Sequence, residues 1–290
     1  MNRSCMLILC MLIYTVNGME KDWNAHKYSK NSDLQYNAAM RGLSNIEFKG
    51  NEKVIDIGCG DGKVTAKIAK LVPQGSVIGV DKSENQIKHA QNNHRLGNLS
   101  FDVMDISDEM RCPFTGIPYH GFDHQFNLVT AFSSLSWIKD QPQAFKNIAF
   151  LLAYEGKLRA GLAHEDSPYL RARFGMCMQD KWKQFFIDYE IPFYPSNEKK
   201  VREMLEIAGL KEELIAKIEA PHMFKNRQEF IDWMSAIPAQ IDRIPQERHE
   251  EFFNDIIDEY LKEVPQEEDG SIKVSISALA VRAEFTPSCW

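Results

Sequence analysis

Three glycines at alternate positions, Gly58, Gly60 and Gly62, are the residues whose spacing most directly indicates chemistry. They follow the short apolar run 54–57, which is typical of a strand buried on both faces. Apolar residues at helical spacing come next, so the sequence predicts a strand, a glycine turn and a helix. Glycine has no Cβ, which lets it adopt a positive φ and lets a ligand approach the backbone closely. We therefore expect a ligand at this turn.

Two alternative roles for the turn stay open. Dinucleotide-binding turns have the spacing G-x-G-x-x-G, which would place the third glycine at position 63. That position is Lys63, so the tight packing of a third glycine is missing. A purely structural turn between a strand and a helix also uses one or two glycines, although three at alternate positions are unusual for it.

Acidic residues follow the next two predicted strands. Asp81 ends the apolar run 76–80, and it lies 25 positions beyond Asp56 (81 − 56). The carboxyl end of a second parallel strand is close to a cofactor crevice, where a carboxylate accepts hydrogen bonds from ribose hydroxyls. The alternative is that Asp81 caps the helix that begins near Ser83. Asp105 ends the third predicted strand, but aspartate is common in any turn.

Composition and charge describe an ordinary globular chain. Apolar residues make up 44% and charged residues 26% of the 290 residues, enough for one large domain or one domain with an insertion. The net charge of −7 argues against a nucleic-acid substrate, which usually calls for a basic face. None of the six cysteines has C-x-x-C spacing or clusters with histidine, so we expect reduced thiols and no metal site.

The order of predicted elements is that of an α/β protein with a parallel sheet. Between residues 54 and 162, strands are expected over 54–57, 76–80, 100–104, 126–132 and 157–162, with helices over 63–71, 84–95 and 142–152 and a polar loop over 105–123. A helical segment is expected over 23–45 before them. After them we expect an aromatic-rich helix over 167–193, helices over 197–209, 226–235 and 245–261, and strands over 213–219 and within 272–285.

The pattern from Asp56 to Gly62, acidic-x-G-x-G-x-G, resembles the cofactor-binding turn of class I S-adenosylmethionine methyltransferases. The stretches 134–141 and 144–148 and the pair Leu151-Leu152 are similar to one branch, which holds insect juvenile hormone acid methyltransferases and bacterial trans-aconitate methyltransferases. The resemblance implies a Rossmann-like α/β fold. Its mostly parallel seven-stranded sheet has helices on both faces and helical cap elements around 165–195 and 226–262.

The resemblance also implies S-adenosylmethionine as cofactor and a small molecule as methyl acceptor. An acidic residue at the position of Asp105 binds the adenine amino group in this family, and Ile106 is expected against the ring. A side chain in place of Gly58 is expected to occupy the cofactor's place. The residues expected to bind the cofactor are Asp56, Gly58, Gly60, Gly62, Asp81, Lys82, Asp105, Ile106 and Phe132.

The acceptor is expected to be a carboxylate, which is already a nucleophile at pH 7 and needs donors that orient it but no general base. Gln35, in a segment similar to the lid of the juvenile hormone enzymes, and Trp137 offer an amide and an indole N–H for this. The alternatives are a solvated helix face for Gln35 and a core position for Trp137. Arg171 and Arg173 are candidates to pair with an acidic substrate, unless they are simply exposed.

Two further functions stay open: an N- or C-methyltransferase with another small acceptor, and a cofactor-binding protein without catalysis. The amine-methylating signature N-P-P-[YF] is missing after the fourth strand, where residues 131–134 read A-F-S-S. The chain also departs from the branch at Glu155, where a glycine is usual. We expect glutamate to be tolerated there if its backbone angles are ordinary.

The first eighteen residues differ from the rest. Residues 6–16 form an apolar run that is too short to span a bilayer and is similar to a secretory signal. Alternatively, translation begins at Met19, where a hydrophilic stretch opens. Because S-adenosylmethionine is made in the cytosol, we expect a cytoplasmic methyltransferase domain over 19–290 without stable membrane association, and a secreted protein as the alternative.

Overall fold

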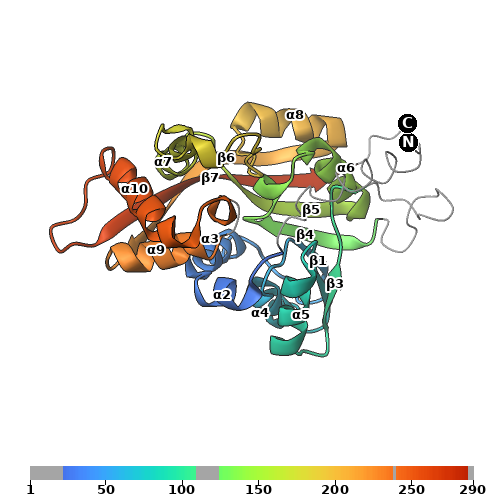
Figure 1. The fold of residues 1–290 in the computed structure, drawn as a ribbon. Helices are drawn as coiled ribbons and strands as arrows, with labels where there is room; N and C mark the ends of the chain where they lie inside the picture. The colour runs from blue at the N-terminus through green and yellow to red at the C-terminus, as the bar shows by residue number, and fades with distance from the viewer. Residues whose placement is uncertain (1–21, 109–123, 238–239, 287–290) are drawn as a thin grey trace, which may run out of the picture.

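The computed structural model describes residues 22–108, 124–237 and 240–286 (Figure 1). The segment 1–18 and most of the loop predicted over 105–123 lie outside these residues. In the described part of the chain, seven strands form one sheet: β1 (Lys53–Ile57), β2 (Ser76–Asp81), β3 (Leu99–Val103), β4 (Phe126–Phe132), β5 (Leu152–Ala163), β6 (Leu210–Phe224) and β7 (Ile272–Phe285).

The strand order in this sheet is β3-β2-β1-β4-β5-β7-β6. The five strands from β3 to β5 run parallel, and β7 is inserted antiparallel between β5 and β6. The expected α/β fold with a mostly parallel sheet is therefore confirmed. The carboxyl ends of β1, β2 and β4 meet at one edge, which is where ligands bind in open α/β sheets.

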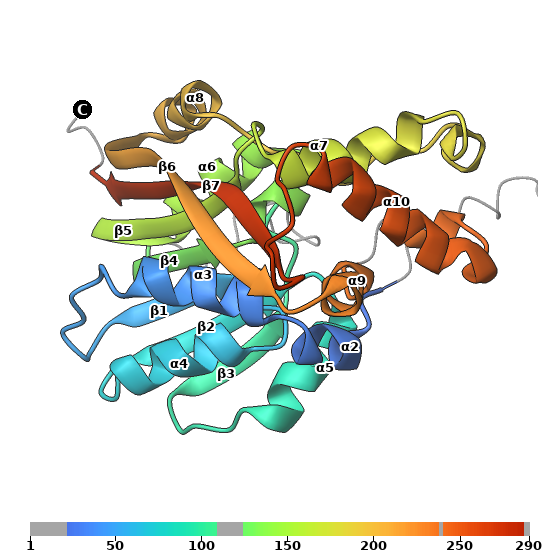
Figure 2. The same ribbon diagram turned by 90° about the vertical axis from the view of Figure 1, so that its left-hand side faces the viewer.

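Five helices accompany the sheet in the described residues: α3 (Asp33–Leu43), α4 (Lys63–Leu71), α5 (Glu84–Asn93), α6 (Gln141–Leu151) and α8 (Glu198–Ala208). Strand β1 shows why both faces are covered. Val54 packs with α3 and α4, whereas Ile55 and Ile57 belong to the cluster with α6 and α8, because successive side chains of a strand point to opposite faces. Figure 2 shows α3 and α4 in front of the strands and α6 behind them.

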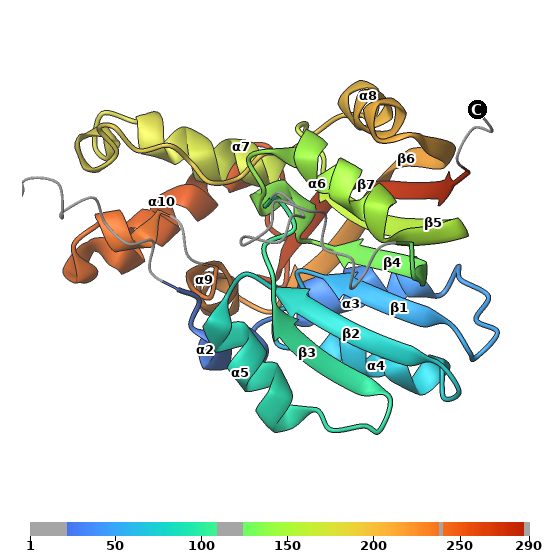
Figure 3. The same ribbon diagram turned by 90° about the vertical axis from the view of Figure 1, so that its right-hand side faces the viewer.

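A second hydrophobic cluster lies at one end of the sheet (Figures 1 and 3). It consists of α7 (Pro168–Gly175), α9 (Arg227–Ser235), α10 (His249–Leu261) and the segment 176–193, which together are called the cap below. Ile272 and Val274 of β7 belong to this cluster, so the sheet continues into the cap. Over the described residues, no helix has both the length and the apolar character needed to cross a membrane.

The helix predicted over 167–193 is wrong in its extent. Helix α7 ends at Gly175, and only short 3-10 turns follow at 176–178 and 183–185. The aromatic residues of this segment have helical spacing, but the backbone becomes extended at Gln179, with ψ of 144°, and left-handed at Asp188, with φ of 57°, so the segment is not one helix. The rings pack on α10 instead, where the centroids of Trp182 and Phe252 are 5.0 Å apart.

Other boundaries differ in smaller ways. The helix predicted over 23–45 is two helices, α2 (Ala25–Lys30) and α3, which separate where Ser32 Oγ donates a hydrogen bond to Asp61 Oδ2 at 3.0 Å. Helix α10 begins at His249, later than predicted, and strands β5, β6 and β7 are longer than predicted. Strand β5 is longer at its start, where Leu152 pairs with Phe126 of β4, and β6 and β7 are longer because they pair with each other along almost their whole length. The sequence pattern does not reveal these pairings.

Glutamate at position 155 was expected to be tolerated if its backbone angles were ordinary. They are not ordinary. Its φ is 57°, in the left-handed region, where a residue with a Cβ is strained by about 1–2 kcal/mol. The neighbouring Gly156 is held closely, since a Cβ there would lie 2.7 Å from the carbonyl oxygen of Ala153. The turn before the main part of β5 thus keeps a geometry suited to glycine while carrying glutamate.

Candidate active site

The glycine turn is fixed to β2 by its own backbone. Gly58, Gly60 and Gly62 have φ values of 66°, 52° and 81°, a region that glycine adopts readily. The N–H groups of Gly58 and Cys59 both donate to the carbonyl oxygen of Val80, at 2.7 and 3.0 Å. These two hydrogen bonds fix the shape of the turn against the end of β2.

The surroundings of the three glycines differ. A Cβ on Gly58 would lie 2.2 Å from the Cβ of Ser134, and a Cβ on Gly62 would lie 2.8 Å from that of Ala90. A Cβ on Gly60 would meet Tyr28 at 3.4 Å, which is ordinary contact. A side chain at position 58 would therefore collide first with the protein itself, and not simply with a cofactor as the sequence suggested.

Asp81 is held in place by main-chain donors at the end of β2. Its Oδ2 accepts a hydrogen bond from the N–H of Gly60 at 2.9 Å, and its Oδ1 accepts one from the N–H of Ser83 at 2.9 Å. Burial raises the pKa of this carboxyl, and the two N–H donors oppose that rise. The cap of helix α5 is Ser83, whose Oγ accepts from the N–H of Gln86 at 3.1 Å. Helix α5 is therefore capped by Ser83 and not by Asp81, whose carboxylate lies beside the glycine turn.

Asp56 lies beneath the turn. Its two carboxyl oxygens accept hydrogen bonds from Thr65 Oγ1 at 2.6 Å and from Thr130 Oγ1 at 2.7 Å. Burial is the main cause that raises its pKa from 3.8 to about 6, and the two threonine donors act against it. These contacts join β1 to α4 and β4, so Asp56 supports the turn from below.

A cavity of about 250 Å³ opens beside the turn at the carboxyl ends of the parallel strands. Of the expected cofactor residues, Asp56 and Gly62 do not line it; Gly62 is instead the N-cap of α4. Asp105 lines it and also closes a local turn, because its Oδ1 accepts hydrogen bonds from the N–H and Oγ of Ser107 at 2.9 and 2.6 Å. The other expected cofactor residues on the wall are Gly58, Gly60, Asp81, Lys82, Ile106 and Phe132.

The segment containing α2 forms hydrogen bonds with both sides of the cavity wall. The sequence did not predict these contacts. Asp22 accepts hydrogen bonds from Ser83 Oγ at 2.5 Å and from the N–H of Asn85 at 3.1 Å, at the start of α5. At the glycine turn, Ser32 Oγ contacts both Asp61 Oδ2, at 3.0 Å, and Lys63 Nζ, at 3.1 Å. Figures 2 and 3 both show α2 beside α5. The segment therefore bridges the two strand ends that carry the turn and Asp81.

Gln35 lines the cavity from α3, and its amide has a defined orientation. The indole Nε1 of Trp233 lies 3.3 Å from Gln35 Oε1. An indole N–H can only donate, so the carbonyl oxygen of Gln35 must face Trp233 and the amide nitrogen must point elsewhere. Trp233, which orients this side chain, lines the same cavity and belongs to the cap. No sequence pattern marks this pair, whose members are 198 positions apart.

Trp137 lines the cavity from a short 3-10 turn after β4. Its ring makes edge contacts with Trp23, at a centroid distance of 5.4 Å, and with Phe193, at 4.7 Å. Within the described residues, none accepts a hydrogen bond from its indole N–H. The structure thus brings Gln35 and Trp137 to one cavity, together with seven of the nine expected cofactor residues.

The sheet order, the glycine turn after β1 and the carboxylate after β2 define a nucleotide-cofactor-binding protein of the doubly wound α/β class. The family described as "Methyltransferase domain" matches residues 37–209 of the sequence. The chain therefore belongs to the class I methyltransferases, and it is an S-adenosylmethionine-dependent enzyme.

Individual relatives agree with this assignment. The juvenile hormone acid O-methyltransferase of Bombyx mori is 32% identical over 250 residues, which are 81% of this chain and 85% of that protein. The trans-aconitate 2-methyltransferase of Variovorax paradoxus is 26% identical over 164 residues, 56% of this chain and 59% of that one. The crystal structure of the YcgJ protein of Bacillus subtilis shares the fold with a TM-score of 0.59 and 14% identity, covering 87% of this chain and all of that one.

The residues present fit S-adenosylmethionine. The backbone at Gly58 and Gly60 forms one wall without side chains, and the fixed carboxylate of Asp81 offers an acceptor for hydroxyl groups next to it. Asp105 and Ile106 add an acceptor and an apolar surface from the neighbouring strand end. The wall therefore offers acceptors and an apolar surface that suit the ribose and the adenine of this cofactor.

Proposed function

We propose that this enzyme methylates the carboxylate of a small, largely apolar organic acid. The observation that carries the proposal is the orientation of Gln35, because Trp233 engages its carbonyl oxygen and leaves its amide N–H groups as donors at the cavity. Trp137 adds an indole N–H on the same cavity. Two neutral donors without an adjacent base suit an acceptor that already carries a negative charge.

The chemistry of the cavity supports an acceptor that needs no deprotonation. S-adenosylmethionine, when bound, supplies a methyl group activated by a sulfonium leaving group. The protein then has to position the acceptor oxygen, and a carboxylate with a pKa near 4 is ionised at pH 7. Among the described residues that line the cavity there is no histidine, the side chain most often used as a general base.

The wall around the two donors is mainly apolar. Leu170, Phe174 and Phe193 line it from the cap, and Trp23 lines it from the N-terminal segment. Such a wall excludes water and strengthens the hydrogen bonds to a bound carboxylate. The names of the relatives from Bombyx mori and Variovorax paradoxus, one an acid O-methyltransferase and the other acting on an aconitate, favour the same kind of acceptor.

The test compares variants of the two donors with matched controls. Gln35→Ala and Trp137→Phe each remove one neutral hydrogen bond, worth about 0.5–1.5 kcal/mol, so kcat/KM on a panel of carboxylic acids should fall several-fold. Gln228→Ala, an exposed glutamine on α9, and Trp182→Phe, whose indole binds Asp255 outside the cavity, should leave kcat/KM within about twofold. Equal losses in test and control variants would contradict the assigned roles.

The pH dependence of turnover separates the competing acceptors. With a carboxylate, kcat/KM should be flat from about pH 7 to 9, since no proton is removed. A rate that climbs steeply over this range would indicate an amine or hydroxyl acceptor and would overturn the proposal. Tight binding of S-adenosylhomocysteine without turnover of any acid would favour the non-catalytic alternative.

A further inference from the structure

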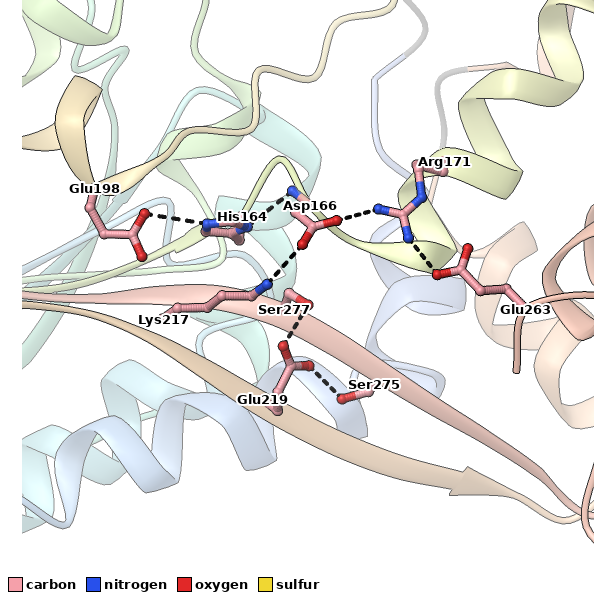
Figure 4. Close-up of polar contacts among 9 residues, drawn as sticks. All are labelled: His164, Asp166, Arg171, Glu198, Lys217, Glu219, Glu263, Ser275 and Ser277. Carbon is pink, nitrogen blue, oxygen red and sulfur yellow. Dashed lines mark hydrogen bonds and ion pairs between the residues drawn. The ribbon is translucent and has the colours of Figure 1, made fainter. Parts of the chain in front are cut away.

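The two arginines of α7, which the sequence offered as partners of an acidic substrate, bind groups of the protein. Arg171 is about half exposed, and its guanidinium pairs with Asp166 and Glu263 outside the cavity, each at 2.5 Å (Figure 4). Arg173 lines the cavity but is only 5% exposed, and its three nitrogens donate to α7 itself and to the chain after α9. A buried polar group at the cavity without such partners is a stronger indication of a ligand contact, because its burial costs free energy.

Gln86 on α5 is a group of this kind. It lines the cavity together with Asp81 and Lys82, and it is only 2% exposed. Its Oε1 is buried, and no residue in the described part of the chain donates a hydrogen bond to it. Buried amide oxygens are normally paired, so an unpaired one in a residue on the wall of a ligand cavity indicates a contact with the ligand.

The usual structural role of a glutamine at this place is taken by another residue. Ser83 and Gln86 have the S-x-x-Q spacing of a capping box, in which the serine hydroxyl accepts from the glutamine N–H and the glutamine side chain accepts from the serine N–H. The first of these hydrogen bonds forms, at 3.1 Å. The N–H of Ser83 donates instead to Asp81 Oδ1 at 2.9 Å, so the end of the helix does not use the side chain of Gln86.

We infer that Gln86 is a further cofactor-binding residue, whose carbonyl oxygen accepts a hydrogen bond from a ribose hydroxyl of S-adenosylmethionine. The ribose has two neighbouring hydroxyl groups. Each oxygen of Asp81 already accepts one main-chain N–H, from Gly60 or Ser83, so a second acceptor on the same wall suits a pair of hydroxyls. Because no described residue holds the Gln86 oxygen and the last torsion of glutamine is broad, the amide can turn this oxygen toward the cavity. The role concerns the cofactor and does not depend on the nature of the acceptor.

The substitution Gln86→Met should change the stability of the ligand-free protein and the affinity for the cofactor in opposite directions. Methionine has a similar length and no polar oxygen to leave unpaired, so the Tm without ligand should rise by a few degrees. The Kd of S-adenosylhomocysteine, measured by calorimetry, should rise about two- to tenfold, the effect of losing one hydrogen bond between neutral groups. A residue that only stabilises the fold would give the reverse, a lower Tm and an unchanged Kd.

Analogues of the cofactor identify the group that Gln86 binds. The 2′-deoxy and 3′-deoxy forms of S-adenosylhomocysteine each lack one ribose hydroxyl, and both should bind the wild type more weakly than the parent compound. In Gln86→Met, the loss of affinity for one of the two analogues should shrink by about the same two- to tenfold, because the protein partner of that hydroxyl is gone. The loss for the other analogue should stay as it is in the wild type.

Gln91→Met is the matched control on the same helix. The Nε2 of Gln91 donates to the carbonyl oxygen of Phe101 at 3.1 Å outside the cavity, so the Kd and both analogue losses should stay within about twofold of the wild type. Gln86→Leu repeats the measurements if Gln86→Met folds poorly. An unchanged Kd in the Gln86 variants, or analogue losses equal to those of the wild type, would overturn the role of Gln86. Either result would leave carboxylate methylation standing, because turnover of acids tests that proposal separately.

Discussion

At the scale of single residues, Asp56 shows how a buried carboxyl links stability to pH. Its pKa of about 6 lies above the ordinary value of 3.8, so the folded protein holds the proton more tightly than the unfolded chain does. The stability from this group is complete below about pH 4 and is lost as the pH rises through 6. A shift of this size corresponds to about 3 kcal/mol in total.

Replacing Asp56 with asparagine should remove this pH dependence. The side chain keeps its shape, and the hydroxyls of Thr65 and Thr130 can rotate to suit an amide. Urea unfolding of both proteins from about pH 4.5 to 8 should show the wild type losing free energy of unfolding relative to Asp56→Asn up to about pH 7 and a constant difference above it. Parallel curves over the whole range would refute the assigned cause.

The sequence predicted cofactor residues more readily than acceptor residues. Local spacing within two strand–turn units is enough to place the cofactor residues Gly58, Gly60 and Asp81 together. In the structure all three lie on one wall of the cavity. The orientation of Gln35 depends on Trp233, and Arg173 could not be distinguished from Arg171 until the direction of each on α7 was known. Such arrangements come from contacts between distant parts of the chain, which periodicity does not encode.

At the scale of elements, the junction of α2 and α3 joins the N-terminal segment to the glycine turn. Ser32 is 3% exposed and contacts both Asp61 and Lys63, which also form an ion pair at 3.3 Å. The sequence predicted one helix here, because the contact that separates α2 from α3 reaches a residue 29 positions away. The remaining helices α4, α6 and α8 fall close to their predicted bounds, since each buries one regular apolar face.

Ser32→Ala should therefore weaken cofactor binding more than it weakens the fold. The loss of hydrogen bonds to charged partners costs about 1.5–3 kcal/mol, so the Kd of S-adenosylhomocysteine should rise about tenfold or more, and proteolysis near α2 should become faster. Ser44→Ala is the control at the other end of α3, where the hydroxyl donates a hydrogen bond to the carbonyl oxygen of Arg41 on the helix itself. If the Kd of S-adenosylhomocysteine were unchanged in Ser32→Ala, the junction of α2 and α3 would not contribute to cofactor binding.

At the scale of the whole molecule, β7 connects the two main hydrophobic clusters. Its first part, with Ile272 and Val274, is buried in the cap, and its later part, with Leu279 and Val281, is buried between β5 and β6 in the core of the sheet. The cap and the sheet therefore share one continuous strand and cannot separate without breaking it. Only the later part was identified from the sequence as clearly strand-like, although residues 272–277 alternate apolar and polar side chains, which is itself the pattern of a half-buried strand.

The two clusters should consequently unfold together. Calorimetry should show a single transition, and S-adenosylhomocysteine at a hundred times its Kd should add about 2.7 kcal/mol to the stability. That corresponds to a rise of roughly 5–10 °C in Tm for a domain of this size. Two transitions, only one of which responds to the ligand, would show that the cap unfolds independently.

The position of β7 also affects the order in which the protein can be completed during synthesis. Strands β5 and β6 emerge from the ribosome well before residue 272, yet neither pairs with the other, and each has an edge that only β7 covers. Until those residues are available, both edges expose unpaired backbone groups, which favours association with other chains. The nascent chain thus passes through a stage in which the five parallel strands β1 to β5 can form, whereas β6 and the cap cannot yet take their final positions. At that stage, association of incomplete chains competes with completion of the sheet.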